Sequence, residues 1–462
     1  MEEGSSSNQR FKRFIRKIIL LCVGIGFVVV GWVTKDQIVL YFDKTFHQPI
    51  PILKKPEDWI TVFVHGTFSC HFGLLSLSAV FNDSIGKTLY KKIVESKRKD
   101  PSNFIDQAML QRGLIKIQPS YDLHVTNGQH FSAYPLAQVF QDFTHHISQK
   151  QIHTTFYTFG WSGLLSQKQR RIESVRFYNA LTAEIEHYHL LGKHPKIRLV
   201  AHSHGGNLCL NLAAINDILS LPSYDNVSTT TADAATNETL AAMFNYLKKL
   251  PNKESVANAK KFKSFDHVPT AHLTINELVL FGTPVQIETE PLYFSPTFKK
   301  IYHFYSEEDS VQPFDFVSTK KQSSRRIKRT TAQLPKILAF PQLIQGKIVV
   351  NRHRRHHRKE NSKKYALSHK DLWAISWHPG NNPLAPLPIF VFTPLLLAAL
   401  DAQTVACHDV DVNIRITRKY LKIQVAPRDR QELNTLVALP RNTLEEIRCN
   451  LKRWDPYHAI RG

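Results

Sequence analysis

The chain has 462 residues, a formal net charge of +22 at pH 7 and 42% hydrophobic residues. The hydrophobic share is ordinary for a globular protein and excludes a largely disordered chain. The length suits two or three average domains, or one α/β domain with insertions. The positive charge is concentrated, because residues 318–364 contain fifteen Lys and Arg against one acidic residue, Glu360.

The five cysteines are widely spaced and include no Cys-x-x-Cys pair. An odd number at such spacing implies neither a disulfide framework nor a zinc site. We expect no resident metal ion, and no motif indicates a cofactor.

An uncharged apolar segment at residues 18–33 follows a basic N-terminal stretch. It is shorter than the roughly 20 residues that span a bilayer, but residues 14–17 can extend it, because their apolar side chains continue it and their basic side chains can snorkel. The pattern predicts a signal anchor with a transmembrane helix at about residues 14–33, within an N-terminal part at 1–45. A cleaved signal peptide is the competing interpretation, but no Ala-x-Ala-like cleavage site follows. Positive charge before the helix puts the N-terminus in the cytoplasm and the rest of the chain across the membrane.

A run of β-branched and aromatic residues at 59–64 predicts a buried strand that ends in His65-Gly66-Thr67. Acyl-transfer chemistry needs two backbone N–H groups aimed at the oxyanion that forms. Glycine lets the backbone turn its amides toward such a site. We expect Thr67 to supply one N–H; the alternative is a plain turn at the end of a strand.

A second β-rich run, residues 154–159, leads into Gly160-Trp161-Ser162-Gly163. Ser162 invites interpretation as a nucleophile, but no apolar helix follows it, so we assign it to a loop that lines a cleft. Apolar residues recur every three or four positions over 167–191, which predicts an amphipathic helix. Strands that alternate with helices imply right-handed crossovers and a mostly parallel sheet with helices on both faces.

Residues 197–206 read Ile-Arg-Leu-Val-Ala-His-Ser-His-Gly-Gly, a strand that breaks into a small-residue turn before an apolar helix. The segment matches the nucleophile elbow Gly-x-Ser-x-Gly, with Ala201 in place of the first glycine. This pattern puts Ser203 at the apex of a strained turn, with its hydroxyl exposed. His204 is then expected to supply the second oxyanion N–H. The alternative is an ordinary turn with a serine helix cap.

Two further strands are predicted at 277–281 and 301–305, after a polar insertion at 219–273 that we regard as a surface insertion or a lid. An acid a few residues past the carboxyl end of a strand lies where sites form in open parallel sheets. Asp309 is the candidate acid. The weaker candidates are Glu307, Glu308 and Asp315.

The basic insertion at 318–364 follows, with a predicted strand at 346–350 inside it. After the insertion, the sequence Ser-His-Lys-Asp precedes an apolar segment. His369 is the candidate base because of this position, and His378 is the alternative.

Residues 388–400 are apolar, but the segment is short and contains a proline, so it predicts a buried helix rather than a second membrane span. Alternating apolar residues at 410–416 and 421–425 predict a β-hairpin with its turn near Arg418.

Asn442, with Glu445 three residues later, predicts the N-cap of a last helix. This tail carries no visible chemistry. We treat residues 406–462 as a C-terminal extension of the main domain at 46–405.

A serine nucleophile needs a base, and the base needs an acid that fixes its tautomer. Ser203, Asp309 and His369 occur in the chain order of one particular fold. Through Val-His-Gly-Thr-Phe, Ala-His-Ser-His-Gly-Gly, Phe-Gly-Thr-Pro and Ser-His-Lys-Asp-Leu, residues 59–400 resemble the α/β-hydrolase family, in particular its lipase-like and esterase-like members. The resemblance implies a mostly parallel, largely eight-stranded sheet, with Ser203 as nucleophile, His369 as general base and Asp309 as orienting acid. The chain departs from the family pattern at Ala201 and in the enlarged segment between the acid and the histidine.

The first functional hypothesis is a membrane-anchored serine hydrolase that cleaves carboxylic esters, lipid esters among them, through an acyl-enzyme. Acyl transfer to an alcohol is a variant of the same chemistry. The second hypothesis is a binding protein on a hydrolase scaffold, whose basic segment at 320–364 holds anionic membrane lipids or nucleic acid. Nucleic acid is the less favoured partner, because Phe340 is the only aromatic residue between positions 319 and 364 and base stacking needs aromatic side chains.

Overall fold

The computed structural model describes residues 57–68, 89–122, 130–148, 152–219, 273–309, 311, 323–327, 342–356, 359–365, 367–377, 382–401, 409–428 and 435–454. They all belong to one compact unit, Leu53–Gly462. The predicted membrane helix at 14–33, almost all of the polar insertion, Asp315 and His378 lie outside the described residues. Within the described ranges, no helix combines the length and the apolar character that crossing a bilayer requires.

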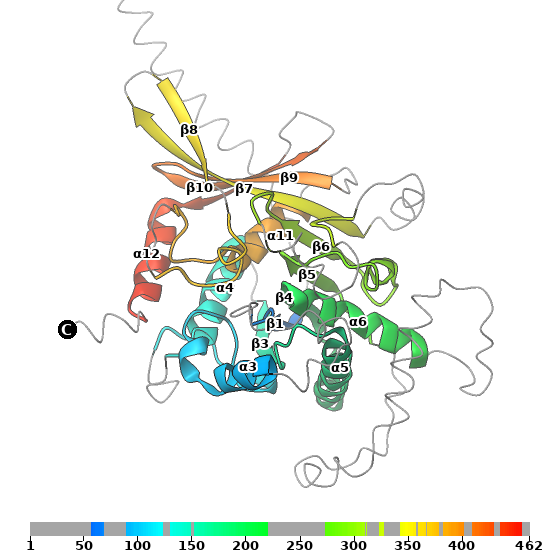
Figure 1. Ribbon diagram of the computed structural model, residues 1–462. Helices are drawn as coiled ribbons and strands as arrows, with labels where there is room; N and C mark the ends of the chain where they lie inside the picture. Colours follow the sequence, from blue (N-terminus) through cyan, green and yellow to red (C-terminus); the bar gives the residue numbers. More distant parts are fainter. Residues whose placement is uncertain are drawn as a thin grey trace, which may run out of the picture. The chain divides into compact units, whose positions relative to one another are not determined.

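A mixed, mostly parallel sheet runs through the described part of the chain (Figure 1). Its parallel core has the order β3-β1-β4-β5-β6-β7-β9, with β2 antiparallel at one edge and β10 and β11 antiparallel at the other. The strands are β1 (Asp58–Val64), β2 (Gly113–Ile117), β3 (His153–Gly160), β4 (Lys196–His202), β5 (Glu277–Phe281), β6 (Ile301–Tyr305), β7 (Leu343–His356), β8 (Lys359–Tyr365), β9 (Asp409–Ile416), β10 (Tyr420–Pro427) and β11 (Thr435–Pro440).

The central strands are short apolar runs because helices cover both faces of the sheet. Successive side chains in a strand point to opposite faces. Accordingly, Phe63 of β1 and Val200 of β4 lie in one hydrophobic core, whereas Val62 and Leu199 lie in the other. The strands predicted at 59–64, 154–159, 277–281 and 301–305 are confirmed as parts of this sheet.

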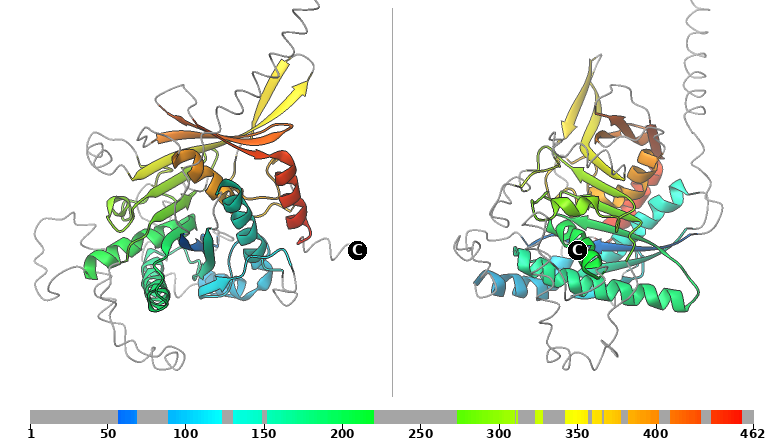
Figure 2. Two further views of the ribbon diagram at one scale, coloured as in Figure 1. Left: turned by 180° about the vertical axis from the view of Figure 1, so that it is seen from behind. Right: turned by 90° about the vertical axis from the view of Figure 1, so that its right-hand side faces the viewer.

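Helices pack on both sides of the sheet (Figure 2). One core joins α4, α11 and α12 to the first face, and the other joins α5 and α6 to the second face. The helices are α3 (Leu89–Lys99), α4 (Ala133–Ile147), α5 (Gln167–Leu190), α6 (His204–Leu219), α11 (Thr393–Asp401) and α12 (Arg441–Lys452), with the 3-10 helices η3 (Pro101–Phe104), η5 (Glu290–Phe294) and η6 (Ile389–Phe392). The helix predicted at 167–191 and the buried helix predicted at 388–400 are confirmed as α5 and as η6 with α11, although the buried side of α5 includes polar residues such as Arg170 and Glu173.

The C-terminal strands lengthen the main sheet rather than forming a sheet of their own. β9 pairs in parallel with β7, and β10 and β11 follow it in antiparallel order. The predicted hairpin is thus confirmed, but the eight strands that the family resemblance implied are too few, because the described residues form an eleven-stranded sheet. The extra strands persist because their alternating apolar side chains pack into the same core as α11 and α12.

The predicted cap at Asn442 is wrong. α12 begins at Arg441, directly after Pro440 ends β11, and no side chain caps it. Glu445 instead forms ion pairs of 3.1 Å with Arg441 and Arg448. The direct passage from strand to helix starts the helix one residue before Asn442, so this residue lies inside the first turn.

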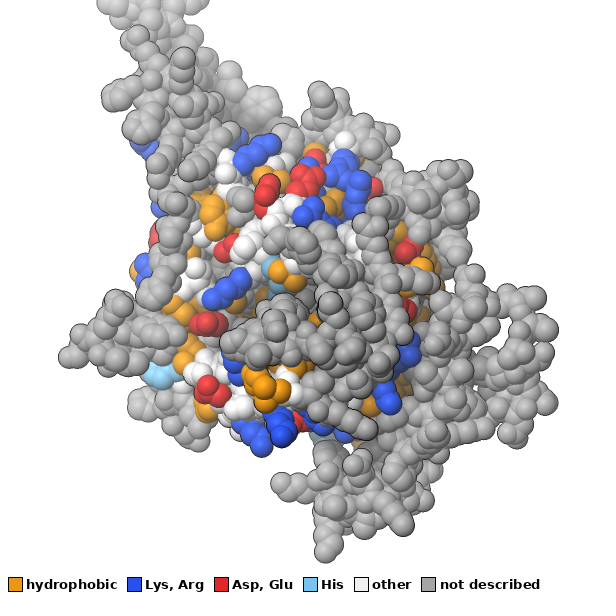
Figure 3. Space-filling view, viewed as in Figure 1, with side chains coloured by type: hydrophobic (Ala, Val, Ile, Leu, Met, Phe, Trp, Pro, Cys, Tyr) orange, Lys and Arg blue, Asp and Glu red, His pale blue; other side chains and the backbone are white. Residues whose placement is uncertain are grey.

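Ion pairs join several strands at the surface. Lys347 Nζ of β7 lies 3.4 Å from Glu307 and 3.6 Å from Asp411, and Arg428 lies near the same two carboxylates. On the face shown in Figure 3, basic and acidic side chains likewise stand close together.

Replacing Phe140 of α4 with Ala is expected to lower the free energy of unfolding by about 3 to 5 kcal/mol. The Phe140 ring is fully buried, 5.8 Å from the ring of Phe63 and 5.7 Å from that of Phe156, so its loss leaves a cavity between helix and sheet. Chemical denaturation measures the difference. Leu190→Ala is the control, because this side chain is 86% exposed and its loss should change stability by less than about 0.5 kcal/mol. Equal effects of the two variants would show that the described core is misassigned.

Candidate active site

Ser203 lies in the turn between β4 and α6, at the carboxyl end of the parallel strands. Its φ is +52°, in the left-handed region that residues other than glycine rarely adopt, and no other non-glycine residue in the described stretches has a positive φ. The Ser203 N–H donates to the carbonyl oxygen of Phe281 at 2.9 Å, which holds the turn against the end of β5. A strained, anchored turn at this position is the geometry that the nucleophile elbow requires.

The end of β1 packs directly against this turn. A Cβ added at Gly66 would lie 2.9 Å from Ser203 Cβ and 2.9 Å from His202 Nδ1, so only glycine fits there without a shift. Thr67 is the residue that follows Gly66. His204 is the first residue of α6, where the positive end of the helix dipole lies.

Asp309 and His369 form a hydrogen-bonded pair. His369 Nδ1 donates to Asp309 Oδ2 at 2.7 Å, and the Asp309 side chain is fully buried whereas that of His369 is 16% exposed. Asp309 follows β6, and His369 follows β8. The bond fixes the tautomer with the proton on Nδ1, so Nε2 is left as the basic nitrogen.

Gly282 places this pair next to the serine turn. Gly282 follows Phe281, the residue whose carbonyl group accepts from Ser203. A Cβ at Gly282 would lie 3.0 Å from His369 Nδ1 and 3.1 Å from Asp309 Oδ2, and its φ of +59° also favours glycine. The structure thus places the Asp309–His369 pair and the Ser203 turn at the carboxyl ends of β4, β5 and β6, with no hydrogen bond between Ser203 and His369 among the described residues.

The weaker acid candidates are engaged elsewhere or lie outside the described residues. Glu307 pairs with Lys347 and Arg428, and the exposed Glu308 side chain has no contact with His369 among the described interactions. Ser162, the discounted serine, is buried in the loop after β3.

Arg325, to which the sequence analysis assigned no role at this site, stabilises the loop that contains Asp309. Its Nε donates to the backbone carbonyl oxygen of Asp309 at 2.9 Å, and the N–H of Val311 donates to Asp309 Oδ1 at 2.9 Å. Arg325 belongs to the basic insertion, and its neighbour Ser324 forms a β-bridge with Val285 just after β5. No sequence signal identifies such a residue, because its partner is a backbone carbonyl group.

His202 binds the backbone of His369, and Trp373 packs against the His202 ring. His202 Nε2 donates to the carbonyl oxygen of His369 at 3.1 Å, and the His202 ring stacks on Trp373 with centroids 5.5 Å apart. The position of His202 directly before the serine was visible in the sequence, but its partner 167 residues away was not.

The Asp371 side chain stabilises the turn that contains His369. Its Oδ2 accepts from the backbone N–H of Ser368 at 2.8 Å and from the Ser368 hydroxyl at 2.6 Å, and its Oδ1 accepts from Asn382 at 3.0 Å. The spacing of Ser368 and Asp371 is the one signal that could have identified this turn, because such short polar side chains bond to nearby backbone groups.

Two buried histidines beside the serine are neutral. Burial, aided by the charge of Arg98, lowers the pKa of His65 to about 3. His65 Nδ1 donates to Gly66 O at 2.7 Å, and its Nε2 accepts from the N–H of Trp161 at 3.3 Å. Burial, with the nearby His369, also lowers the pKa of His202 well below its ordinary value. Neither ring is therefore a competing base with a pKa near neutrality.

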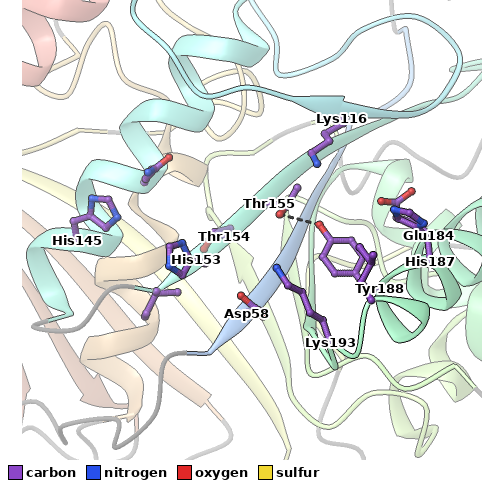
Figure 4. A pocket seen from close by; sticks show the side chains of 13 residues that line it. Asp58, Lys116, His145, His153, Thr154, Thr155, Glu184, His187, Tyr188 and Lys193 are labelled. Carbon is purple, nitrogen blue, oxygen red and sulfur yellow. Dashed lines mark hydrogen bonds between the residues drawn. The ribbon is translucent and has the colours of Figure 1, made fainter.

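Figure 4 shows a hollow of about 590 Å³ at the other end of the sheet. Asp58 and His153, the first residues of β1 and β3, line it, together with Lys116, Glu184 and Lys193. Because Asp58 and His153 lie at the amino ends of their strands, this hollow lies at the end of the sheet opposite to Ser203.

No family model, no curated protein and no solved structure matched this chain. Among the described residues, no group of three or more His, Cys, Asp or Glu side chains is arranged to hold a metal ion.

Because His65 is neutral in the folded protein, we expect the free energy of unfolding to decrease as the pH is lowered. Its folded pKa of about 3 lies below the ordinary value of 6.5, so from pH 6.5 downward the unfolded chain binds a proton that the folded chain does not. Between pH 7 and pH 4 this difference amounts to about 3 kcal/mol, and His65→Gln should show a correspondingly smaller loss. Denaturation at both pH values measures it. His189→Gln, at an exposed histidine, is the control, and an acid dependence unchanged by His65→Gln would disprove the assignment.

Proposed function

We propose that this protein is a serine hydrolase that cleaves carboxylic esters, lipid esters among them. The observation that supports the proposal best is the buried Asp309–His369 hydrogen bond of 2.7 Å, at the same sheet edge as a serine with a left-handed φ of +52°. An ion pair that served only the surface would not need a fully buried carboxylate, because burying a charge costs free energy. The strained backbone of Ser203 likewise costs free energy that the surrounding contacts must offset.

In the proposed reaction, the Ser203 hydroxyl attacks the ester carbonyl carbon while His369 Nε2 takes its proton. Asp309 keeps the other ring proton on Nδ1 and stabilises the imidazolium that forms. The imidazolium then protonates the leaving alcohol, which gives an acyl-enzyme. Water, activated by the same nitrogen, releases the acid; an alcohol in place of water would make the reaction an acyl transfer.

The developing oxyanion needs donors that are already in place. The backbone N–H groups of Thr67 and His204 are the proposed pair. Gly66 brings the first of these residues against Ser203, and the start of α6 brings the second, with the positive end of a helix dipole added.

The proposal includes an α/β-hydrolase fold. The parallel core, the helices on both faces, and the serine, acid and histidine that follow β4, β6 and β8 in turn support it. The additional strands β9 to β11 extend the sheet at the edge beyond β7, away from β4.

Membrane attachment is part of the same proposal. It rests on the sequence of residues 14–33, which would anchor the chain with its N-terminus in the cytoplasm and the catalytic domain on the other side. An ester-bearing lipid would then reach the enzyme from the same membrane.

The basic insertion is proposed as a contact for anionic lipid headgroups, with nucleic acid as the disfavoured alternative. β7 and β8 arrange part of it as an antiparallel ribbon, in which Arg352 is paired with Lys363 and His356 with Lys359. Cross-strand partners share one face of a ribbon, as do residues two apart along a strand. The pairing therefore brings basic residues of both strands, Arg354 among those of β7, into one ribbon.

A fluorophosphonate probe, which reacts with activated serines, is expected to label the wild type but not Ser203→Ala. Asp309→Asn and His369→Ala should slow labelling by about a thousandfold or more, because the serine loses its base or the base loses its tautomer. Ser162→Ala is the matched control, at a buried serine in the loop after β3, and should label like the wild type. The hydrolase proposal fails if Ser203→Ala is labelled as fast as the wild type.

Arg352→Gln with Arg354→Gln is expected to weaken binding of the full-length chain to vesicles that contain phosphatidylserine, by about tenfold or more at low salt. Vesicle flotation at rising salt measures the salt-dependent part of binding. The control replaces Arg418 and Lys419 with Gln, because both lie exposed in the turn between β9 and β10. Equal binding by the two double variants would count against the ribbon as a lipid contact.

A further inference from the structure

Arg98 carries a buried charge that the catalytic proposal does not use. It lies in the last turn of α3, and only 5% of the residue is exposed. Its Nη2 donates to the carbonyl oxygen of Leu110, but its Nε and Nη1 have no acceptor among the described residues. A basic residue at the end of a helix is ordinary, but helix-end stabilisation does not require it to be buried.

No carboxylate neutralises this guanidinium group at ion-pair distance within the described part of the chain. Glu173, the nearest source of attraction, pairs with Arg176 at 3.5 Å. Burial and the charge of Arg112 lower the pKa of Arg98 to about 10, so the group stays cationic at neutral pH. A buried cation with unused donors is costly unless a ligand supplies the acceptors.

Arg98 lines a cavity of about 610 Å³ that also contains two further cations, Lys99 and Arg112. Phe104 and Phe131 form its apolar wall, with ring centroids 5.5 Å apart, and Arg98 lies over the Phe104 ring at 5.3 Å. The cavity is thus shaped for a group that combines negative charge with apolar surface. The acidic residue on its lining, Glu95, is paired with Lys91 on the same helix.

The backbone makes room for the guanidinium group at Gly160. A Cβ at this position would overlap Arg98 Nη2 and the carbonyl oxygen of Gln111, so only glycine allows the arginine to lie there. The site is therefore built from α3, the segment before β2 and the end of β3.

The cavity lies near the catalytic edge of the sheet. Gly160 ends β3, which neighbours β1, which in turn neighbours the strand that leads to Ser203. Two strand spacings put Gly160 about 10 Å from the serine turn. Trp161, the next residue, donates from Nε1 to the carbonyl oxygen of His65 at 2.7 Å, which ties the two regions together.

We propose that this cavity binds a phosphate group. Phosphate offers several acceptor oxygens and up to two negative charges, which suits three cationic side chains better than a single carboxylate does. The phosphate belongs either to a phosphorylated lipid ester that is the substrate of Ser203 or to a free phosphate ion. The first source rests on the proposed function, whereas phosphate binding itself does not.

Calorimetric titration of the full-length protein with inorganic phosphate, at constant ionic strength, tests the site. Arg98→Met should weaken binding at least tenfold, and Arg112→Gln about fivefold. Arg112 is exposed, so its variant keeps the test valid if Arg98→Met fails to fold. Arg418→Gln is the control at an exposed arginine on the turn after β9, and it should bind like the wild type. No binding by the wild type, or equal binding by wild type and Arg112→Gln, would overturn the proposal.

Hydrolysis of a short-chain diacyl glycerophosphate and of the matching neutral diacylglycerol distinguishes the two sources. If the lipid carries the phosphate, Arg112→Gln raises the KM for the glycerophosphate, relative to the KM for the diacylglycerol, by about fivefold. If free phosphate is the ligand, the ratio stays constant while calorimetric binding still weakens. Ser203→Ala separates the two proposals, because it should abolish hydrolysis but bind phosphate like the wild type.

Discussion

The hydrogen bond between Asp309 and His369 is the interaction on which the site depends. It joins residues sixty positions apart and takes a carboxylate out of water entirely. Burying this charge is costly unless its oxygens are satisfied, and both are, by His369 and by the N–H of Val311. Neighbouring side chains hold the backbone of this pair: Arg325 donates to the carbonyl oxygen of Asp309, and His202 donates to that of His369.

Around the serine, burial controls charge. His65 and His202 are buried and neutral and form hydrogen bonds to backbone groups, whereas the His369 side chain is 16% exposed. Arg98 lies close enough to His65 to lower its pKa further. An anion bound beside Arg98 would weaken this effect of Arg98 on the pKa of His65. The basic insertion also has a structural role, because its residue Arg325 donates a hydrogen bond to the backbone of Asp309.

Much of this arrangement follows from the sequence, because it depends on local patterns. The apolar runs at 59–64 and 277–281 form strands wherever a core covers both faces, and the period of 167–191 forms a helix. The small residues around Ser203 permit a left-handed turn, and the chain order of Ser203, Asp309 and His369 suggested one site. Local patterns failed at the ends of elements, as at Asn442, where the end of β11 sets the start of α12.

The tertiary structure decided what depends on distant partners. The tail could have formed a separate hairpin, but the pairing of β9 with β7 made it part of the main sheet. The sequence already favoured Asp309 over Glu307, but the contacts that separate them are tertiary: Asp309 bonds to His369, whereas Glu307 pairs with Lys347. No local pattern in the sequence marks Arg98, whose burial accompanies the close approach of Gly160 to its guanidinium group. A sequence fixes which groups are present and which backbone turns are allowed, but the burial and pairing that set their charges arise only when distant segments meet.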